Sequence, residues 1–371
     1  MDDSQFSVKK DMPDLLSGLI SGEIPHHDVT MKDKNSVYKL SSAIQKCIRR
    51  GMPTQAGFYA QAILHGGGED YLWRRLPIMA LEDIGPANVS LCAAVMEFCR
   101  FKAVRDKFGV EKGLTALVQH MAESHKSRTA CDLVCSVNFF SNDVDQLYQL
   151  ITEDRNGMYA KEALDAMLGW GWLPEAQKAV SWVKDGELVS PVNAKEQGEF
   201  RENQIKQIWE TYGEMAAYLV HSASKKSPAH LHSTMLLAME LLAQDDLKAH
   251  TLKLEPGILL NGIPEWAYDQ HTLEGKKALA YVLKSSDVLK DFEHNYGEVS
   301  LASLGMHMFQ VESAVLNSYL VTMFSASFQV FNDQLESKSC NQLEPYQLKD
   351  ALVSSAFQEE MRYARKRVLG V

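Results

Sequence analysis

The chain has 371 residues, 46% of them hydrophobic, and its 38 lysine and arginine side chains face 48 aspartate and glutamate side chains, giving a formal net charge of -10. This composition excludes a mainly disordered chain, and it excludes a polycation that binds nucleic acid through its overall charge. Any nucleic-acid binding must therefore come from a local basic patch.

Apolar residues recur mostly at spacings of three and four, whereas alternation with period two is hard to find. The sequence therefore predicts an all-α fold, built as a multi-helix bundle. Glycines and prolines mark the ends of short helices in the first half. The predicted helices there are Ser36–Arg50, Pro53–His65, Glu69–Ile84, Ala87–Lys107 and Val110–Glu123, and further helices are expected from Ser127 to Lys184.

A polar stretch at residues 185–197 predicts a boundary between two helical parts. We expect an N-terminal segment at residues 1–35, a first helical domain at 36–184 and a second helical domain at 198–371. The helices predicted in the second domain are Glu199–Ser222, Ser233–Gln244, one after Gly275, Val299–Phe324 and a final helix within Pro345–Val371. Because no repeat of fixed period is found, a bundle is favoured over a solenoid.

The cysteines are scattered, form no C-x-x-C pair and mostly lie in apolar helical patterns, where a thiol behaves as a small hydrophobic group. We therefore expect a reducing compartment, no metal site and no cofactor. The first thirty residues contain no signal-peptide pattern, and the chain contains no apolar run long enough to span a membrane. These features predict a cytoplasmic protein without membrane contact, or one in a host cytoplasm if its source is a phage or mobile element.

Several short motifs between residues 41 and 130 resemble, in order and nearly without gaps, the C-terminal region of the RarA/MgsA group of clamp-loader-like ATPases. They are Ser42-Ala43-Ile44-Gln45-Lys46, Phe58-Tyr59 with Ala62 and Leu64, Gly67-Gly68-Glu69-Asp70, Arg74-Arg75-Leu76, Met79-Ala80 with Glu82-Asp83-Ile84-Gly85 and Ala87, and Ala122 with Lys126-Ser127 and Ala130. In that family this region is the helical collar that tetramerises beside the ATPase, at stalled forks and at junctions of single- and double-stranded DNA.

The resemblance implies a clamp-loader-like first domain in a homo-oligomer that acts in DNA replication, recombination or repair. Its implied partners are DNA, replication proteins or a RarA-type ATPase. The chain has no G-x-x-x-x-G-K-[ST] motif, so we expect no ATP hydrolysis by the chain itself. Pro77 and Pro86 also depart from the family pattern, which affects the expected helix geometry.

Two carboxylates, Glu82 and Asp83, stand at the end of a predicted helix that Gly85 terminates. Negative charge at this end opposes the helix dipole, so both side chains need cationic partners. Arg74 and Arg75, one to two turns earlier, are the expected partners. A structural salt-bridge cluster is favoured over an acid–base pair, and an interface role stays open for these carboxylates and for Gly85, Lys126 and Ser127.

A locally basic region extends from Lys39 to Lys107, with ten lysines and arginines against six carboxylates. The cations either complement helix dipoles on a solvated face or contact phosphate. A second group of cations, Lys276 and Lys277, lies in the helix expected after Gly275, and the segment Arg362–Arg367 is also basic. The predicted DNA-binding residues are Lys46, Arg49, Arg50, Arg74, Arg75, Lys276 and Lys277.

Reactive and charged side chains are most concentrated in one segment of the chain, which contains Asp269, His271, Thr272, Gly275, Lys276 and Lys277. An aspartate two residues before a histidine in a turn can orient the imidazole, and Thr272 could cap a helix whose N-terminus receives a phosphate. The alternative is a capped helix start with exposed charge. Asp269 and His271 are the candidate catalytic residues.

Three functions stay open. The leading hypothesis is a DNA-associated accessory protein of replication, recombination or repair. The second is an enzyme that modifies or excises DNA bases through the segment that begins at Asp269. The third is a mimic that inhibits a host clamp-loader-like ATPase.

Overall fold

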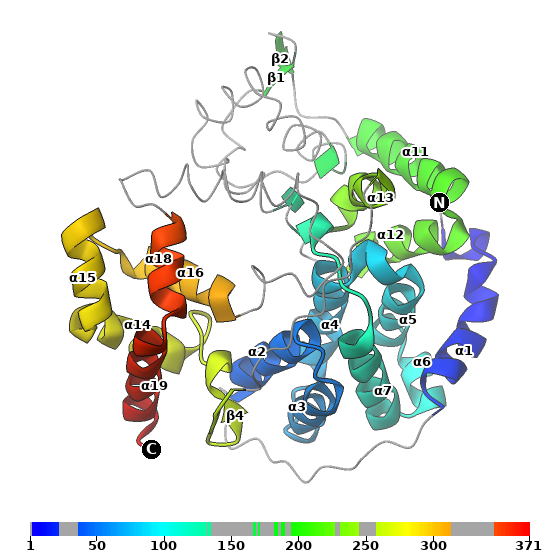
Figure 1. Cartoon of the computed structure of the whole chain (residues 1–371). Coiled ribbons are helices and arrows are strands. Elements are labelled where there is room, and N and C mark those ends of the chain that lie inside the picture. Colours follow the sequence, from blue (N-terminus) through cyan, green and yellow to red (C-terminus); the bar gives the residue numbers. More distant parts are fainter. Residues whose placement is uncertain are drawn as a thin grey trace.

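The computed structural model describes residues 2–21, 36–131, 133–134, 166–167, 170, 182–184, 187–189, 194–226, 231–244, 257–312 and 345–371. Helices make up almost all of this part of the chain, and two short antiparallel hairpins complete it (Figure 1). The predicted all-α fold class is therefore confirmed.

The first half folds as a series of short helices. They are α1 (Val8–Leu19), α2 (Ser36–Arg49), α3 (Pro53–His65), α4 (Glu69–Asp83), a 3₁₀ turn at Gly85–Asn88, α5 (Val89–Arg100), α6 (Lys102–Phe108) and α7 (Val110–Glu123). The predicted bounds of α2, α3, α4 and α7 are confirmed to within one residue. Proline at the first turn starts α3, and the positive φ of Gly109 precedes α7, so punctuation residues set these ends.

Three helices predicted as continuous are broken. The range Ala87–Lys107 divides at Phe101, whose backbone is extended, and the Arg105 guanidinium caps the end of α5 through the carbonyls of residues 98 and 99. The second break separates α11 (Ala194–Tyr212) from α12 (Glu214–Lys226) at Gly213, which has φ of 90°. The third separates α18 (Pro345–Val353) from α19 (Ser355–Leu369) at Ser354, whose side chain caps α19. Helix α16 (Leu301–Glu312) covers part of the predicted Val299–Phe324, and the rest lies outside the described residues.

The remaining elements are α13 (Met235–Gln244), α14 (Leu273–Ser285), α15 (Asp287–Tyr296) and the hairpins β1 (Trp182–Lys184) with β2 (Glu187–Val189) and β3 (Leu259–Leu260) with β4 (Ile263–Pro264). Residues 182–184 are a strand, which corrects the expectation that helices continue to Lys184. Most of the predicted helical stretch from Ser127 lies outside the described residues.

The buried hydrophobic side chains form two clusters. The larger cluster contains side chains of the helices from α1 through α5 and of α7, α11, α12 and α13. It also contains Trp266 and Ala267. The smaller cluster joins α14, α15, α16, α18 and α19, which lie together on one side of the molecule (Figure 1). The predicted domain boundary stays a prediction, because most of residues 135–193 is outside the described part.

The N-terminal segment docks against the larger cluster. Phe6 is buried beside Trp209, with ring centroids 5.2 Å apart, and beside Tyr218. The carboxylate of Asp3 pairs with Arg100 of α5 at 3.2 Å and with Lys225 of α12 at 2.9 Å, and it lies 3.0 Å from the His221 Nε2. Helix α1 therefore belongs to the folded core rather than to an appended tail.

Four of the cysteines, Cys47, Cys92, Cys99 and Cys131, are buried, and burial raises the pKa of the Cys47 thiol to about 12. These thiols behave as apolar packing groups. Within the described ranges, no single helix is long and apolar enough to cross a membrane. Helix α4 and the segment Gly85–Arg100 meet the length and composition criteria only as a pair that is bent by 99°.

We predict opposite effects for two glycine-to-alanine substitutions in helices. A Cβ at Gly275 would lie 1.9 Å from the carbonyl oxygen of Asp269, so Gly275→Ala should lower the free energy of unfolding by about 3 kcal/mol. A Cβ at Gly198 in α11 meets nothing within 4 Å, so Gly198→Ala should raise it by about 0.5 to 1 kcal/mol. Urea unfolding measures both changes, and equal effects would contradict the packing at Gly275.

Candidate functional site

A buried ion pair joins α2 to the segment that precedes α14. The Lys46 Nζ lies 2.8 Å from the Asp269 Oδ2, and both side chains are at most 2% exposed. Lys46 also donates a hydrogen bond to the carbonyl of Trp266, and the Ser42 hydroxyl donates to Asp269 at 2.8 Å. The carboxylate therefore receives two donors from one turn of α2.

A second buried cluster lies one turn further along α2. The Arg49 Nε lies 2.6 Å from the Asp83 Oδ1, and its Nη2 lies 3.1 Å from the Glu82 Oε1. Arg128 pairs with the same two carboxylates, and the Gln45 amide donates to both. Each carboxylate at the end of α4 is thus satisfied by cations from α2 and from the segment after α7.

The expected partners of these carboxylates are only partly correct. Arg75 lies 3.8 Å from the Glu82 Oε2 and donates to Gln45 at 2.7 Å. Arg74 instead donates to the carbonyl of Asp70, on the exposed side of α4. The two principal partners, Arg49 and Arg128, are distant in sequence from α4, so helical spacing could not identify them.

The segment Lys126–Arg128 closes the end of α4. Lys126 donates to the Ala122 carbonyl at 2.7 Å, and the Ser127 backbone N–H donates to the Asp83 carbonyl at 3.1 Å. Gly85 adopts a φ of 46°, which turns the chain at this point. The motif residues that carry the family resemblance here therefore hold one helix junction together.

The network also reaches the smaller hydrophobic cluster. Arg365 of α19 lies 2.7 Å from the Glu312 carboxylate of α16 and donates to the Tyr268 carbonyl. Arg50 donates to the Glu312 carbonyl, and its guanidinium lies 4.6 Å from the Trp266 ring. Charged groups from α2, α16 and α19 consequently meet around residues 266–269.

Burial and charge act in opposite directions on these groups. Burial by itself would raise the pKa of Glu82, but the guanidiniums of Arg49, Arg128 and Arg75 outweigh it and lower that pKa to about 2. Desolvation lowers the pKa of Lys46, although Asp269 and Glu312 favour its charged form. The network is therefore held as paired charges whose stability depends on every partner.

The two candidate catalytic residues do not form the expected pair. The Asp269 Oδ1 accepts a hydrogen bond from the His271 backbone N–H at 2.9 Å, and the imidazole packs edge-on against Phe309, with ring centroids 5.0 Å apart. The carboxylate is thus bound to Lys46, Ser42 and the backbone, and it does not orient the imidazole. Modification of a DNA base by Asp269 and His271 stays a prediction. It would require the Asp269 carboxylate to leave its ion pair with Lys46.

The expected helix cap is confirmed. The Thr272 hydroxyl accepts a hydrogen bond from the Gly275 N–H at 3.0 Å and starts α14. Lys276 and Lys277, in the first turns of α14, are exposed. The functional segment inferred from the sequence therefore separates into a buried acid and an exposed basic helix.

Burial divides the predicted DNA-binding residues into two sets. Lys46 and Arg49 are buried and paired with carboxylates, so in this conformation neither side chain can reach a phosphate. Arg50 lies partly buried against Trp266. The exposed members are Arg74, Lys276 and Lys277, and Arg75 is 31% exposed.

An exposed basic surface lies where α14 and α19 pack side by side (Figure 1). The Tyr281 and Tyr363 rings have centroids 6.3 Å apart, and the Arg367 guanidinium lies 5.2 Å from the Tyr281 ring. Helical spacing places exposed lysines beside these rings on each helix. We call the set the α14–α19 surface, and it comprises Lys277, Tyr281, Lys284, Tyr363, Lys366 and Arg367.

Acidic neighbours reduce the charge of this surface only slightly. Glu274 pairs with Lys39 at 2.8 Å, and Glu360 accepts a hydrogen bond from the Asp287 backbone N–H at 3.1 Å. Glu359 is exposed on α19, one turn before Tyr363. Four cations therefore stand against one exposed carboxylate on these faces. The sequence did not identify Tyr281 and Lys284 as candidate binding residues, because only the packing of α14 against α19 brings them beside the basic residues of α19.

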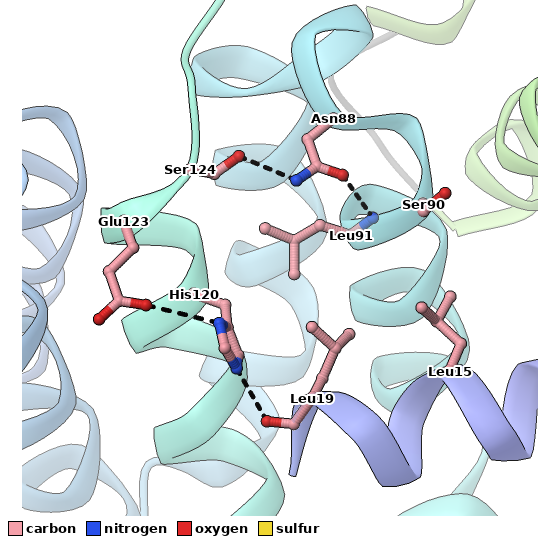
Figure 2. A pocket seen from close by; sticks show the side chains of 8 residues that line it. All are labelled: Leu15, Leu19, Asn88, Ser90, Leu91, His120, Glu123 and Ser124. Carbon is pink, nitrogen blue, oxygen red and sulfur yellow. Dashed lines mark hydrogen bonds and ion pairs between the residues drawn. The ribbon is translucent and has the colours of Figure 1, made fainter. Parts of the chain in front are cut away.

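A separate small pocket of about 220 Å³ lies between α1, α5 and α7 (Figure 2). Leucines of α1 and α5 form its apolar wall, while the His120 Nε2 donates a hydrogen bond to the Leu19 carbonyl at 2.9 Å. The Asn88 amide donates to the Ser124 hydroxyl at 3.1 Å. These polar groups are already hydrogen-bonded within the protein, so the side chains around the pocket mainly hold α1 and α5 against α7. Among the described residues, no group of three or more histidines, cysteines or carboxylates could hold a metal ion.

No protein-family model matches the chain, and comparisons with curated proteins and with solved structures find no match either. The resemblance to the RarA/MgsA collar therefore stays a prediction that depends on the motifs between residues 41 and 130.

We predict that Lys46→Met lowers the free energy of unfolding by about 3 to 5 kcal/mol, because it leaves the Asp269 carboxylate buried without its cation. In Lys46→Met/Asp269→Asn part of this loss should be recovered, with a coupling energy of about 1 to 3 kcal/mol in a double-mutant cycle. Lys102→Met, in the exposed pair with Asp106, is the control and should change stability by less than about 1 kcal/mol. Additive losses at residues 46 and 269 would contradict the ion pair.

We also predict that stability falls in acid through Glu82. Its pKa is lowered from 4.5 to about 2 in the folded chain, so the folded state binds this proton less tightly than the unfolded state. The stabilisation is therefore present above about pH 5 and is lost as pH falls toward 2, by on the order of 3 kcal/mol. Glu82→Gln should show a shallower loss in urea unfolding between these pH values, and identical slopes would refute the assignment.

Proposed function

We propose that this chain is a DNA-associated accessory protein of replication, recombination or repair, which binds DNA without hydrolysing ATP itself. The observation that carries the proposal is the α14–α19 surface. Two basic segments that are ninety residues apart in the sequence, around Lys277 and Arg367, contribute to one exposed face.

Local electrostatics support DNA over other partners. The chain as a whole is acidic, with a net charge of -10, so nonspecific attraction to DNA is weak except where cations gather. Four exposed cations on two adjacent helices can follow a phosphate backbone, and their binding would release condensed counterions. Cations that are buried in ion pairs, such as Lys46, are not required for this contact.

The tyrosines add a second kind of contact. Tyr363 is 56% exposed, and its ring meets that of Tyr281. Exposed aromatic rings among cations are typical of single-stranded nucleic-acid surfaces, where each base stacks on a ring irrespective of sequence. We therefore expect single-stranded or forked DNA to bind more tightly than duplex DNA.

The family resemblance supports the same class of function through another part of the chain. It implies self-association and contact with replication proteins or a RarA-type ATPase, and these partners stay predictions. The motif residues Gln45 and Asp83 are buried, and Glu82 is only 17% exposed, so any such partner would mainly contact the outer faces of these helices.

The test replaces four cations of the α14–α19 surface together, as Lys277→Gln/Lys284→Gln/Lys366→Gln/Arg367→Gln. Binding to single-stranded, duplex and forked DNA is measured over a range of salt concentrations. The slope of log K against log salt should fall in magnitude by about 3, since each lost phosphate contact removes about 0.7 to 0.9.

A matched control carries the same charge change elsewhere. Lys102, Lys195, Lys206 and Lys290 all lie in exposed ion pairs, and replacing these four with glutamine should leave the slope nearly unchanged. Equal losses in both quadruple variants would mean that binding follows net charge, and this would overturn the assigned surface. Mass spectrometry of the recovered nucleosides separates this proposal from a base-modifying enzyme, which would alter them.

A further inference from the structure

The side chains of the α14–α19 surface follow one another in a fixed order. Tyr281 of α14 contacts both Tyr363 and Arg367 of α19. Ser286, five residues further along α14, donates a hydrogen bond to Glu360, which precedes both contacts in α19. The two helices are therefore antiparallel at this surface. Along it the exposed groups come in the order Lys284, the two tyrosine rings, Lys366 with Arg367, and Lys277.

The two tyrosine rings are not equally available to a nucleic-acid base. Tyr281 is half-buried and has the Arg367 guanidinium 5.2 Å from its centroid, whereas Tyr363 is 56% exposed. A base inserted between two rings needs them parallel and about 7 Å apart, which is twice the contact distance of about 3.5 Å. The Tyr281 and Tyr363 rings are 6.3 Å apart and tilted by 48°. A base therefore stacks on the outward face of Tyr363, and Tyr281 supports that ring.

The spacing of the cations limits the length of strand that the surface can hold. Lys277 and Lys284 are seven residues apart on α14, which places them about 10 Å apart along the helix axis. A stacked strand advances by about 3.4 Å per nucleotide, and an extended strand advances further. At most about four phosphates consequently lie between these two lysines.

Carboxylates close the surface beyond Lys284. Asp287 begins α15 with its side chain 86% exposed, and it pairs with Lys290 at 2.7 Å. Glu360 lies beside it, because its carboxylate accepts a hydrogen bond from the Asp287 backbone N–H at 3.1 Å, and Glu359 is exposed on α19. Phosphates that continued past Lys284 would meet these negative charges, so the favourable path of a strand ends there.

We propose that the α14–α19 surface binds a short unpaired segment of about four nucleotides, with one base stacked on Tyr363 and the phosphates on the cations at either side. This inference rests on the proposed function and names the length of strand that the surface takes. A gap, flap or overhang of this length is then a complete ligand. A longer strand gains only from its greater number of equivalent positions.

Oligothymidylates from about two to about eight nucleotides long test the length with the full chain. Affinity should rise steeply up to about four nucleotides, and from there to about eight it should rise only by the statistical factor of about five. The slope of log K against log salt should stop increasing at the same length, because no further phosphate meets a cation. A slope that continues to grow beyond this length would overturn the proposal.

Two tyrosine variants test the stacking contact. Tyr363→Leu should weaken binding of the short oligothymidylates about tenfold, within the range for loss of one base–aromatic stack. It should leave the salt slope and the affinity for fully paired duplex unchanged, since the cations remain. Tyr296→Leu is the matched control, because Tyr296 is also exposed, at 39%, but stands on α15 against Phe292. Equal affinities of Tyr363→Leu and Tyr296→Leu for the short strands would contradict the stacking contact.

A fluorescent base separates failure of this inference from failure of the proposed function. 2-Aminopurine, placed in turn at each position of a short single-stranded gap, should be quenched on binding, and Tyr363→Leu should abolish the quenching. If the quadruple cation variant loses DNA binding but Tyr363→Leu changes neither affinity nor quenching, this inference alone is wrong. If the cation variant binds DNA normally, or the unaltered chain binds none, the proposed function is wrong as well.

Discussion

The buried pair between Lys46 and Asp269 is the interaction on which the arrangement of this protein depends. Lys46 belongs to α2, in the larger hydrophobic cluster, whereas Asp269 precedes α14, which opens the smaller one. Neither charge can return to water without separating these elements, because both side chains are almost fully buried. Removing one partner alone would leave an isolated buried charge, which is far more costly than losing an exposed pair.

The other buried charges extend this constraint in two directions. Arg49 and Arg128 fix the end of α4 through Glu82 and Asp83, and Arg365 fixes α19 through Glu312. Apolar contacts are non-directional, whereas these bonds have defined geometry. The network therefore accounts for how the two apolar clusters are positioned against each other, while the clusters supply most of the burial.

The buried cations and the exposed cations therefore have different roles. Lys46 and Arg49, from the predicted basic region, are buried in ion pairs, whereas the cations of the α14–α19 surface are exposed and free to meet a partner. An acidic protein can thus present basic contacts at chosen places without a basic overall composition.

The sequence by itself determined the helical class, the bounds of α2, α3, α4 and α7, and the cap at Thr272, because periodicity, punctuation and capping act within a few residues. It also located the chemically dense residues Glu82, Asp83 and Asp269. It did not determine the breaks at Phe101 and Ser354, nor the partners of those carboxylates. Lys46 and Asp269 are more than two hundred residues apart, and Asp83 and Arg128 are 45 residues apart, so only the packed tertiary structure could decide which charges became buried pairs and which stayed exposed.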